Sequence, residues 1–243
     1  LEGIKADFDA AQTHLDDARD AATRADDQGR LGAIFGNLGI LATVRGDSMQ
    51  AVLHYTEAIK SYTRSRHQYG ICQTHHNLGM CYAGQGEYTE ALASYARGEA
   101  LATQLGTLDV LAHVKISAAV AHLRLGDPSA AETACQQATH LMERLDDRLG
   151  LAECRKVEGM ILREQAAYEE GAQRLEQGLH VFRELENQLG VAECELELGV
   201  LERDRGDLAA ARDRVAESVS MFEALGAAAD VERGRALLAQ MPS

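Results

Sequence analysis

Cysteine and histidine side chains that could bind a metal ion gather near residue 75 of this 243-residue chain. Cys72, His75 and His76 lie within two turns of a predicted helix. His113 could face His76 from the next helix of the same kind. Structural zinc sites usually take four ligands from recognisable cysteine and histidine pairs, and the sequence has no second pair here. We therefore expect no metal or other cofactor, and we interpret these side chains as surface or groove residues.

The common sequence motifs of catalysis are missing from the chain. It contains no GxxxxGK[ST], HExxH, GxSxG or GxGxxG segment, so it has no recognisable phosphate-binding loop or nucleophile turn. An odd number of cysteines at wide spacing, without a CxxC pair, is a poor disulfide framework. These cysteines are Cys72, Cys81, Cys135, Cys154 and Cys194. We expect a protein without enzymatic activity, located in the reducing cytoplasm.

The composition favours helices and argues against nucleic acid as a partner. Asp and Glu total 38 against 24 Lys and Arg, a formal net charge of −14. A surface that binds a duplex needs basic residues to neutralise phosphates. Two Pro and no Trp, with abundant Ala, Leu, Glu and Arg, indicate an all-α fold. No uncharged apolar segment reaches the roughly 18 residues that span a bilayer, so we expect no membrane partner either.

The sequence repeats with a period of forty residues. The segment Asn37-Leu38-Gly39 recurs as Asn77-Leu78-Gly79, a shift of 40. A glycine suited to a left-handed helix end recurs in the same register, usually followed by an acidic residue that could cap the next helix. These glycines are Gly46, Gly86, Gly126 and Gly206. Each copy therefore predicts a helical hairpin.

We interpret the whole chain, 1–243, as a single repeat array. Residues 1–28 fit the second half of a repeat, and residues 228–241 fit a first helix that caps the array. The full copies between them are 29–68, 69–108, 109–148, 149–188 and 189–227. The first helix of the opening repeat and an initiator Met are both missing. This predicts a piece of a longer protein that carries an effector domain before residue 1.

Small and aromatic residues recur where the two helices of a hairpin should approach most closely. When the copies are aligned with a shift of 40, Gly39 and Gly79 occupy the same position, which we call a column of the repeat. A large side chain at this position would hold the two backbones apart. Tyr55 and Tyr95 share another column in the second helix. We expect these tyrosines to pack between helices rather than to contact a ligand.

These columns resemble the tetratricopeptide repeat family. Its pattern has Leu-Gly in the first helix, Gly and an acidic residue in the turn, and Ala, an aromatic and Ala in the second helix. One copy carries them as Leu38-Gly39, Gly46-Asp47, Ala51, Tyr55 and Ala58. The period is similar to that of kinesin light chains, Leu-Gly-Asn repeat adaptors and bacterial multidomain regulators. The resemblance implies helical hairpins stacked into an open right-handed superhelix, with first helices on its concave side.

The fourth copy departs from the family pattern. Glu158 replaces the Leu of the Leu-Gly pair, and Ala166-Ala167 replaces the Gly and acidic residue of the turn. We therefore expect an atypical turn in this hairpin.

The resemblance implies that the concave groove binds a partner through one face of the first helices. We assign this groove to Asn37, Gln73, His76, Asn77, Met80, His113, Ser117, Arg163 and Arg203. In the 40-residue relatives, Asn in the column of Asn37 and Asn77 pairs with a peptide backbone, since an amide both donates and accepts hydrogen bonds. The alternative is that each amide bonds to a neighbouring helix.

Three hypotheses about function follow. The first is a non-catalytic scaffold that binds a protein or extended peptide in the groove. The second is a sensor domain in which the groove binds a small metabolite and biases an attached bacterial ATP-dependent regulator of transcription or signalling. The apolar residues Ile40 and Met80 on the groove floor suit either ligand. The third is self-association through the terminal helix within residues 1–28.

Overall fold

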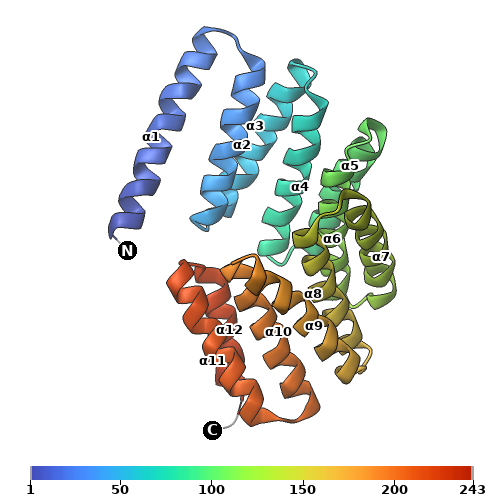
Figure 1. Ribbon diagram of the computed structural model, residues 1–243. Coiled ribbons are helices and arrows are strands. Elements are labelled where there is room, and N and C mark those ends of the chain that lie inside the picture. The colour runs from blue at the N-terminus through green and yellow to red at the C-terminus, as the bar shows by residue number, and fades with distance from the viewer. Residues whose placement is uncertain (1, 242–243) are drawn as a thin grey trace. The chain divides into compact units, whose positions relative to one another are not determined.

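The computed structural model describes the backbone of residues 2–241 and the side chains of residues 9–241, and this range is entirely helices and short turns (Figure 1). Its helices are α1 (Glu2–Arg24), α2 (Gln28–Val44), α3 (Ser48–Arg64), α4 (Gln68–Gly84), α5 (Tyr88–Leu105), α6 (Leu108–Arg124), α7 (Pro128–Leu145), α8 (Arg148–Glu164), α9 (Tyr168–Glu184), α10 (Gln188–Arg205), α11 (Leu208–Leu225) and α12 (Ala228–Gln240). The predicted all-α fold is confirmed. Within this range, no helix combines the length and apolarity needed to cross a membrane.

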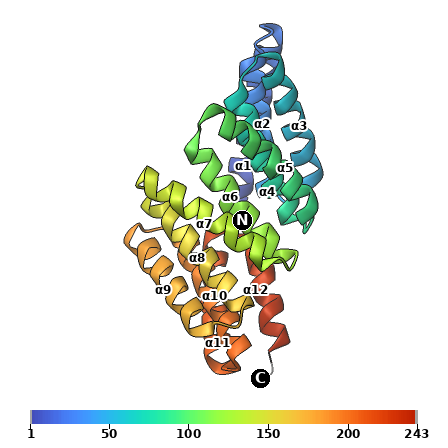
Figure 2. The ribbon, with the colours of Figure 1, turned by 90° about the vertical axis from the view of Figure 1, so that its right-hand side faces the viewer.

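The helices form two compact units, which we call unit 1 (Leu1–Leu125) and unit 2 (Gly126–Ser243). In unit 1, each helix from α1 to α6 packs against the next along the chain, and in unit 2 the same holds from α7 to α12 (Figure 2). The first helices of successive copies also touch within a unit: α2 contacts α4, α4 contacts α6, and α8 contacts α10. The hypothesis of self-association concerns α1. The side chains of this helix up to residue 8 lie outside the residues whose side chains the structure describes.

The spacing of the helices is regular because the turns are uniform. Helices α2, α3 and α4 begin at residues 28, 48 and 68, and this spacing continues to α12 at residue 228. Gly46 takes the left-handed conformation with φ +77°, and the Asp47 side chain then accepts a hydrogen bond from the Gln50 backbone N–H at 3.1 Å. Asp127 and Asp207 cap their helices in the same way, as the sequence predicts, whereas the Glu87 side chain makes no capping hydrogen bond with α5.

The expectation of an atypical turn in the fourth hairpin is wrong. Ala166 adopts the same left-handed conformation as the glycines, with φ +58°. The Ala166 backbone N–H bonds to the Arg163 carbonyl at 2.9 Å, just as Gly46 bonds to Thr43 at 3.0 Å. Packing of the flanking helices fixes this turn, and a residue with a Cβ accepts strain of about 1 kcal/mol to fit it. Ala167 provides no side-chain cap for α9.

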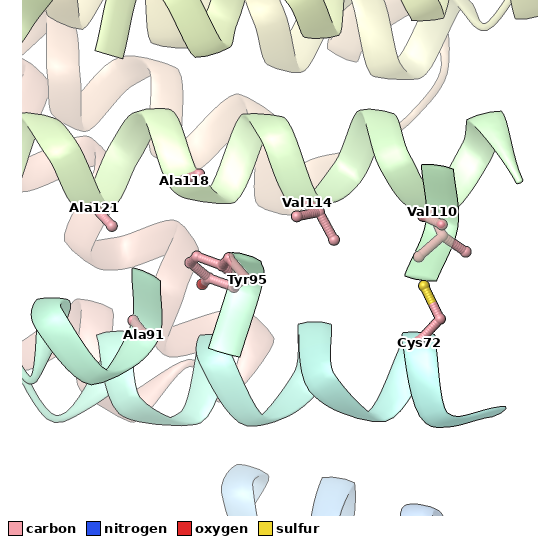
Figure 3. Packing of buried hydrophobic residues seen from close by; sticks show 8 residues of the cluster. Cys72, Ala91, Tyr95, Val110, Val114, Ala118 and Ala121 are labelled. Carbon is pink, nitrogen blue, oxygen red and sulfur yellow. The ribbon is translucent and has the colours of Figure 1, made fainter. Parts of the chain in front are cut away.

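The glycine of the Leu-Gly pair lets a tyrosine ring lie against the helix backbone. A Cβ added at Gly79 would lie 2.3 Å from Cε1 of Tyr95, and one at Gly39 would lie 2.5 Å from Cε1 of Tyr55. Tyr95 is 2% exposed and packs in a core cluster with Cys72 and Val114 (Figure 3). The prediction that these tyrosines pack between helices is confirmed. This packing fixes α4 against α5 and holds the opposite face of α4 in place.

Candidate functional site

A hollow of about 460 Å³, open to solvent, lies on unit 1 along α2, α4 and α6. Five of the residues predicted for the groove line it: Asn37, Gln73, His76, Asn77 and His113. Much of the remaining wall is small or apolar, with Ala33, Gly36, Ile40, Gly70 and Val110 among its residues. We call this hollow with its lining residues the unit 1 hollow.

Three consecutive first helices bring these side chains together because each repeats the same register. Asn37 on α2 and Asn77 on α4 are 40 residues apart, as are Gln73 on α4 and His113 on α6. Residues at this spacing occupy the same height on neighbouring stacked helices. Gly70 lets the ring of Tyr62 pack close to α4, since a Cβ there would lie 2.7 Å from the ring atom Cε2.

The amide groups of Asn37 and Asn77 are available for hydrogen bonding. Neither side chain has an intramolecular hydrogen-bond partner among the residues that the structure describes. The alternative, in which each amide bonds to a neighbouring helix, is therefore not observed. Each amide offers two donors and one acceptor oxygen, so the pair can bind a chain of peptide groups without reading its side chains.

His76 is a neutral hydrogen-bonding group in the wall of the unit 1 hollow. Its Nε2 lies 3.0 Å from Oγ of Ser117, and its ring lies 5.9 Å from the ring of Tyr95. Burial and the neighbouring His113 lower the pKa of His76 to about 4. Ser117, another predicted groove residue, lies on α6, so its contact with His76 links α6 to α4.

A second polar contact crosses from α4 to α6, and sequence reasoning missed it. Gln73 Nε2 donates to the Tyr69 hydroxyl oxygen at 3.1 Å, and the Tyr69 hydroxyl donates to Oδ2 of Asp109 at 3.3 Å. Burial and the Asp109 carboxylate raise the pKa of Tyr69, which keeps the phenol protonated. Tyr69 and Asp109 are 40 residues apart, and this shared column is the signal that could have found the pair.

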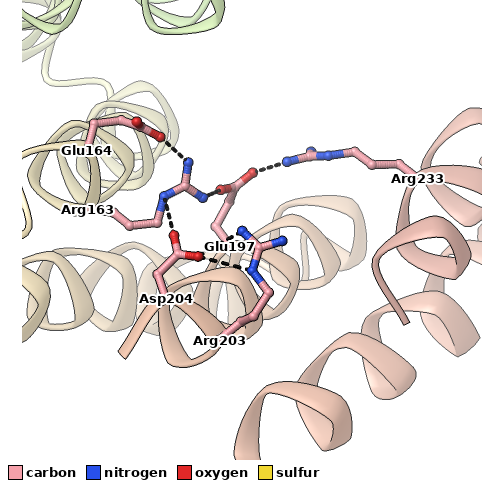
Figure 4. A network of polar contacts seen from close by, with 6 residues as sticks. All are labelled: Arg163, Glu164, Glu197, Arg203, Asp204 and Arg233. Carbon is pink, nitrogen blue, oxygen red and sulfur yellow. Dashed lines mark hydrogen bonds and ion pairs between the residues drawn. The ribbon is translucent and has the colours of Figure 1, made fainter. Parts of the chain in front are cut away.

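The remaining predicted groove residues lie elsewhere. Met80 on α4 is 52% exposed and is not part of the lining. Arg163 on α8 and Arg203 on α10 belong to unit 2, where both point into a network of carboxylates (Figure 4). Arg203 pairs with Asp204 at 2.8 Å, and the Arg163 side chain is only 9% exposed.

The unit 2 network is centred on a buried carboxylate, Glu197. This side chain is 4% exposed and pairs with Arg163 at 3.1 Å and with Arg233 at 2.5 Å, which ties α10 to both α8 and α12 (Figure 4). Arg163 also pairs with Glu164 at 2.6 Å and lies 3.6 Å from Asp204. The charged groups of this network are thus paired with one another, although the buried Nε of Arg163 makes no hydrogen bond among the described residues.

A second ion-pair cluster in unit 2 surrounds Lys156. Its ammonium pairs with Glu153 at 2.6 Å and with Glu193 of α10. Burial disfavours the charged form of Lys156, but the Glu193 and Glu153 carboxylates outweigh burial and raise its pKa. Lys156 therefore stays protonated and tied to α10.

A smaller hollow of about 220 Å³ in unit 2 lies beside Glu158, the residue that departs from the family pattern. Glu158 pairs with Arg155 at 2.7 Å and with Arg174 at 3.5 Å, and it accepts a hydrogen bond from Thr139 at 3.5 Å. The carboxylate is therefore fully occupied by its own neighbours. The other copies have a buried leucine or alanine at this position, and the fourth copy has an ion pair there instead.

Cys72, His75 and His76 are not arranged as a metal site. Across the residues that the structure describes, no group of three or more His, Cys, Asp or Glu could hold a metal ion. Cys72 is buried and donates to the Gly98 carbonyl at 3.1 Å. Burial and nearby Asp109 raise the pKa of Cys72 to about 11, so its thiol is neither a ready nucleophile nor a ready ligand.

Comparison with known sequences identifies the repeat type. Residues 70–144 match the model of the family described as tetratricopeptide repeat, and the resemblance stated from the sequence is confirmed. A search of curated proteins found no match.

Solved structures share the fold at low sequence identity. The apo form of RapI has a TM-score of 0.71 and 11% identity, covering 96% of this chain and 91% of that one. A Rap protein complexed with competence and sporulation factor has a TM-score of 0.69 and 15% identity, with 98% and 71% covered. BtubC (BKLC) from P. vanneervenii has a TM-score of 0.68 and 20% identity, with 90% and 91% covered. These similarities show a shared tetratricopeptide-type helical fold.

Proposed function

We propose that this chain, whose residues 70–144 are tetratricopeptide repeats, is a non-catalytic interaction scaffold that binds an extended peptide of a partner protein in the unit 1 hollow. The observation that carries the proposal is the pair of equivalent amides, Asn37 and Asn77, which have no intramolecular partner within the described residues. An extended peptide leaves its own N–H and C=O groups unpaired, and each amide can bond to both kinds of group.

The rest of the unit 1 hollow supports the same proposal. Gly36 and Ala33 leave room for a backbone to approach α2, and Ile40 offers an apolar surface beside the amides. His76 and Gln73 add neutral polar groups on α4. The neighbour of the same fold that was solved with competence and sporulation factor adds support, because that Rap protein binds a factor.

The test is a binding measurement with peptides selected from a display library of random linear sequences. The tightest wild-type peptide is titrated calorimetrically into the wild type and into an Asn37→Ala/Asn77→Ala variant. Loss of two hydrogen bonds, each contributing about 0.5–1.5 kcal/mol, should weaken binding by at least about fivefold. Circular dichroism checks that both proteins are folded.

The matched control removes two other exposed amides, Gln104 and Gln137, which also have no intramolecular partner among the described residues. A Gln104→Ala/Gln137→Ala variant should bind the peptide as the wild type does. Equal affinity of the Asn37→Ala/Asn77→Ala variant and the wild type would overturn the proposal.

The second candidate function is the small-metabolite sensor, and the size of the unit 1 hollow favours it. A volume of about 460 Å³ lies within the range of roughly 300–1,000 Å³ typical of small-molecule pockets. A metabolite library can be screened by shifts in melting temperature. A compound that saturates the wild type, displaces the selected peptide and loses affinity in the Asn37→Ala/Asn77→Ala variant would favour the sensor.

A further inference from the structure

The unit 1 hollow carries one fixed negative charge. Asp109 is the one carboxylate among the described residues that line it, and none of them is Lys or Arg. His76 in the same wall is neutral at physiological pH because its pKa is about 4. The surrounding chain is acidic overall, with a formal net charge of −14. The electrostatic potential in the hollow therefore favours a cation.

The Asp109 carboxylate is held in place by one oxygen and keeps the other available. Its Oδ2 accepts from the Tyr69 hydroxyl at 3.3 Å, and Tyr69 is itself oriented by Gln73 Nε2 at 3.1 Å. Its Oδ1 has no intramolecular hydrogen-bond partner in the part of the chain that the structure describes. A group bound at Asp109 thus meets an oriented acceptor.

This pair exists in one place in the chain. The column that Tyr69 and Asp109 share has Gly29 in the preceding copy and Leu149 and Leu189 in the following ones. Both leucines are partly exposed, at 41% and 45%. Neither turn packing nor the repeat pattern therefore requires an aromatic or an acidic residue at this position.

We infer that the unit 1 hollow selects peptides that present a cationic group, an arginine or lysine side chain or a free α-ammonium, to Asp109. This inference rests on the proposed peptide-binding function. A carboxylate accepts shorter and stronger hydrogen bonds from an ammonium or guanidinium than from a neutral donor. A peptide with acidic side chains finds no compensating lysine or arginine in the lining, so the hollow discriminates against it.

The test compares the peptides that the library yields for the wild type and for an Asp109→Asn variant. Wild-type selections should be enriched in Arg and Lys, or should require a free N-terminus, which N-acetylated copies of the same peptides distinguish. The selected peptide should bind Asp109→Asn about two- to fivefold more weakly at low salt, as for an exposed ion pair. This difference should shrink at high salt because screening weakens exposed charges.

The matched control is Glu90→Gln. Glu90 is exposed in the first turn of α5 in the same unit, just as Asp109 lies in the first turn of α6, so both variants lose one charge at a helix N-terminus. Glu90→Gln should bind the peptide as the wild type does.

The outcomes separate this inference from the proposed function. Peptides that need Asn37 and Asn77 but show no cationic preference, or bind Asp109→Asn unchanged, would overturn the inference and leave the proposed function standing. Peptides that bind Asn37→Ala/Asn77→Ala unchanged, or a library that yields no binder, would overturn both.

Discussion

Asn77 in unit 1 and Glu197 in unit 2 occupy the same column of the repeat, yet their surroundings are opposite. Asn77 lines an open hollow and has no intramolecular hydrogen-bond partner among the described residues. Glu197 is 4% exposed and is bound by Arg163 and Arg233. A polar residue on the face of a first helix is therefore available to a partner only where the neighbouring copies leave it unpaired.

The same contrast extends to the column of Gln73. In unit 1 this column holds Gln73 and His113, which line the unit 1 hollow. In unit 2 it holds Glu153 and Glu193, and both pair with Lys156. Buried charges are costly unless they are paired, and removal of one partner leaves the other charge uncompensated, so the ion pairs of unit 2 depend on one another. We therefore place the proposed peptide site on unit 1 and treat Arg163, whose buried guanidinium pairs with Glu197, as structural.

The largest effect should come from breaking the unit 2 network. A Glu197→Gln variant leaves the buried guanidinium of Arg163 without its most buried carboxylate and removes one partner of Arg233. Loss of one member of a buried ion pair should lower the free energy of unfolding by about 3 kcal/mol. Urea unfolding followed by circular dichroism measures this change.

Asn77→Ala is the control from the same column in unit 1. Its amide makes no intramolecular hydrogen bond within the described residues, so the free energy of unfolding should change by no more than about 0.5 kcal/mol. If Asn77→Ala destabilises the protein as much as Glu197→Gln, the contrast between the two faces is refuted.

A smaller loss of stability should appear when the pH is lowered, because of His76 in unit 1. The pKa of His76 is about 4 in the folded protein, below its ordinary value near 6.5. Between these values the unfolded chain binds a proton that folded His76 does not, so stability falls as pH drops through this window. The loss from His76 between about pH 7 and about pH 5 should be roughly 1–2 kcal/mol.

His76→Gln isolates this contribution. The variant keeps a side chain that can bond to Ser117 but cannot take up a proton in this range. Its stability, measured by urea unfolding, should fall less between the two pH values than that of the wild type. His75, whose pKa is also lowered by burial, leaves some acid sensitivity in both proteins. An identical pH dependence would show that His76 is not buried in its neutral form.

The sequence predicts the fold well because local chemistry repeats. Gly46 ends a helix and Asp47 caps the next one, and the spacing that places Gly79 under the ring of Tyr95 is visible in the forty-residue shift. Ala166 shows the limit of this reasoning, since a turn whose residues differ keeps the same backbone because the packed helices on either side determine it.

The candidate site is less predictable because pairing depends on three-dimensional neighbours. The column assignment brings Asn37, Asn77 and His113 together in one hollow. The same column assignment also places Arg163 in the groove, although its guanidinium is paired with the carboxylates of Glu197 and Asp204. A first-helix pattern alone does not distinguish an unpaired amide from a paired guanidinium.

The proposed peptide site is tested most directly by locating the bound peptide on the chain. The tightest library peptide, carrying a benzophenone photocrosslinker, is irradiated with the wild-type protein, and the attachment sites are mapped by mass spectrometry. If the peptide binds in the unit 1 hollow, we expect crosslinks on α2, α4 and α6, at residues that line it. Crosslinks concentrated on α8, α10 and α12 of unit 2 would contradict the proposed site.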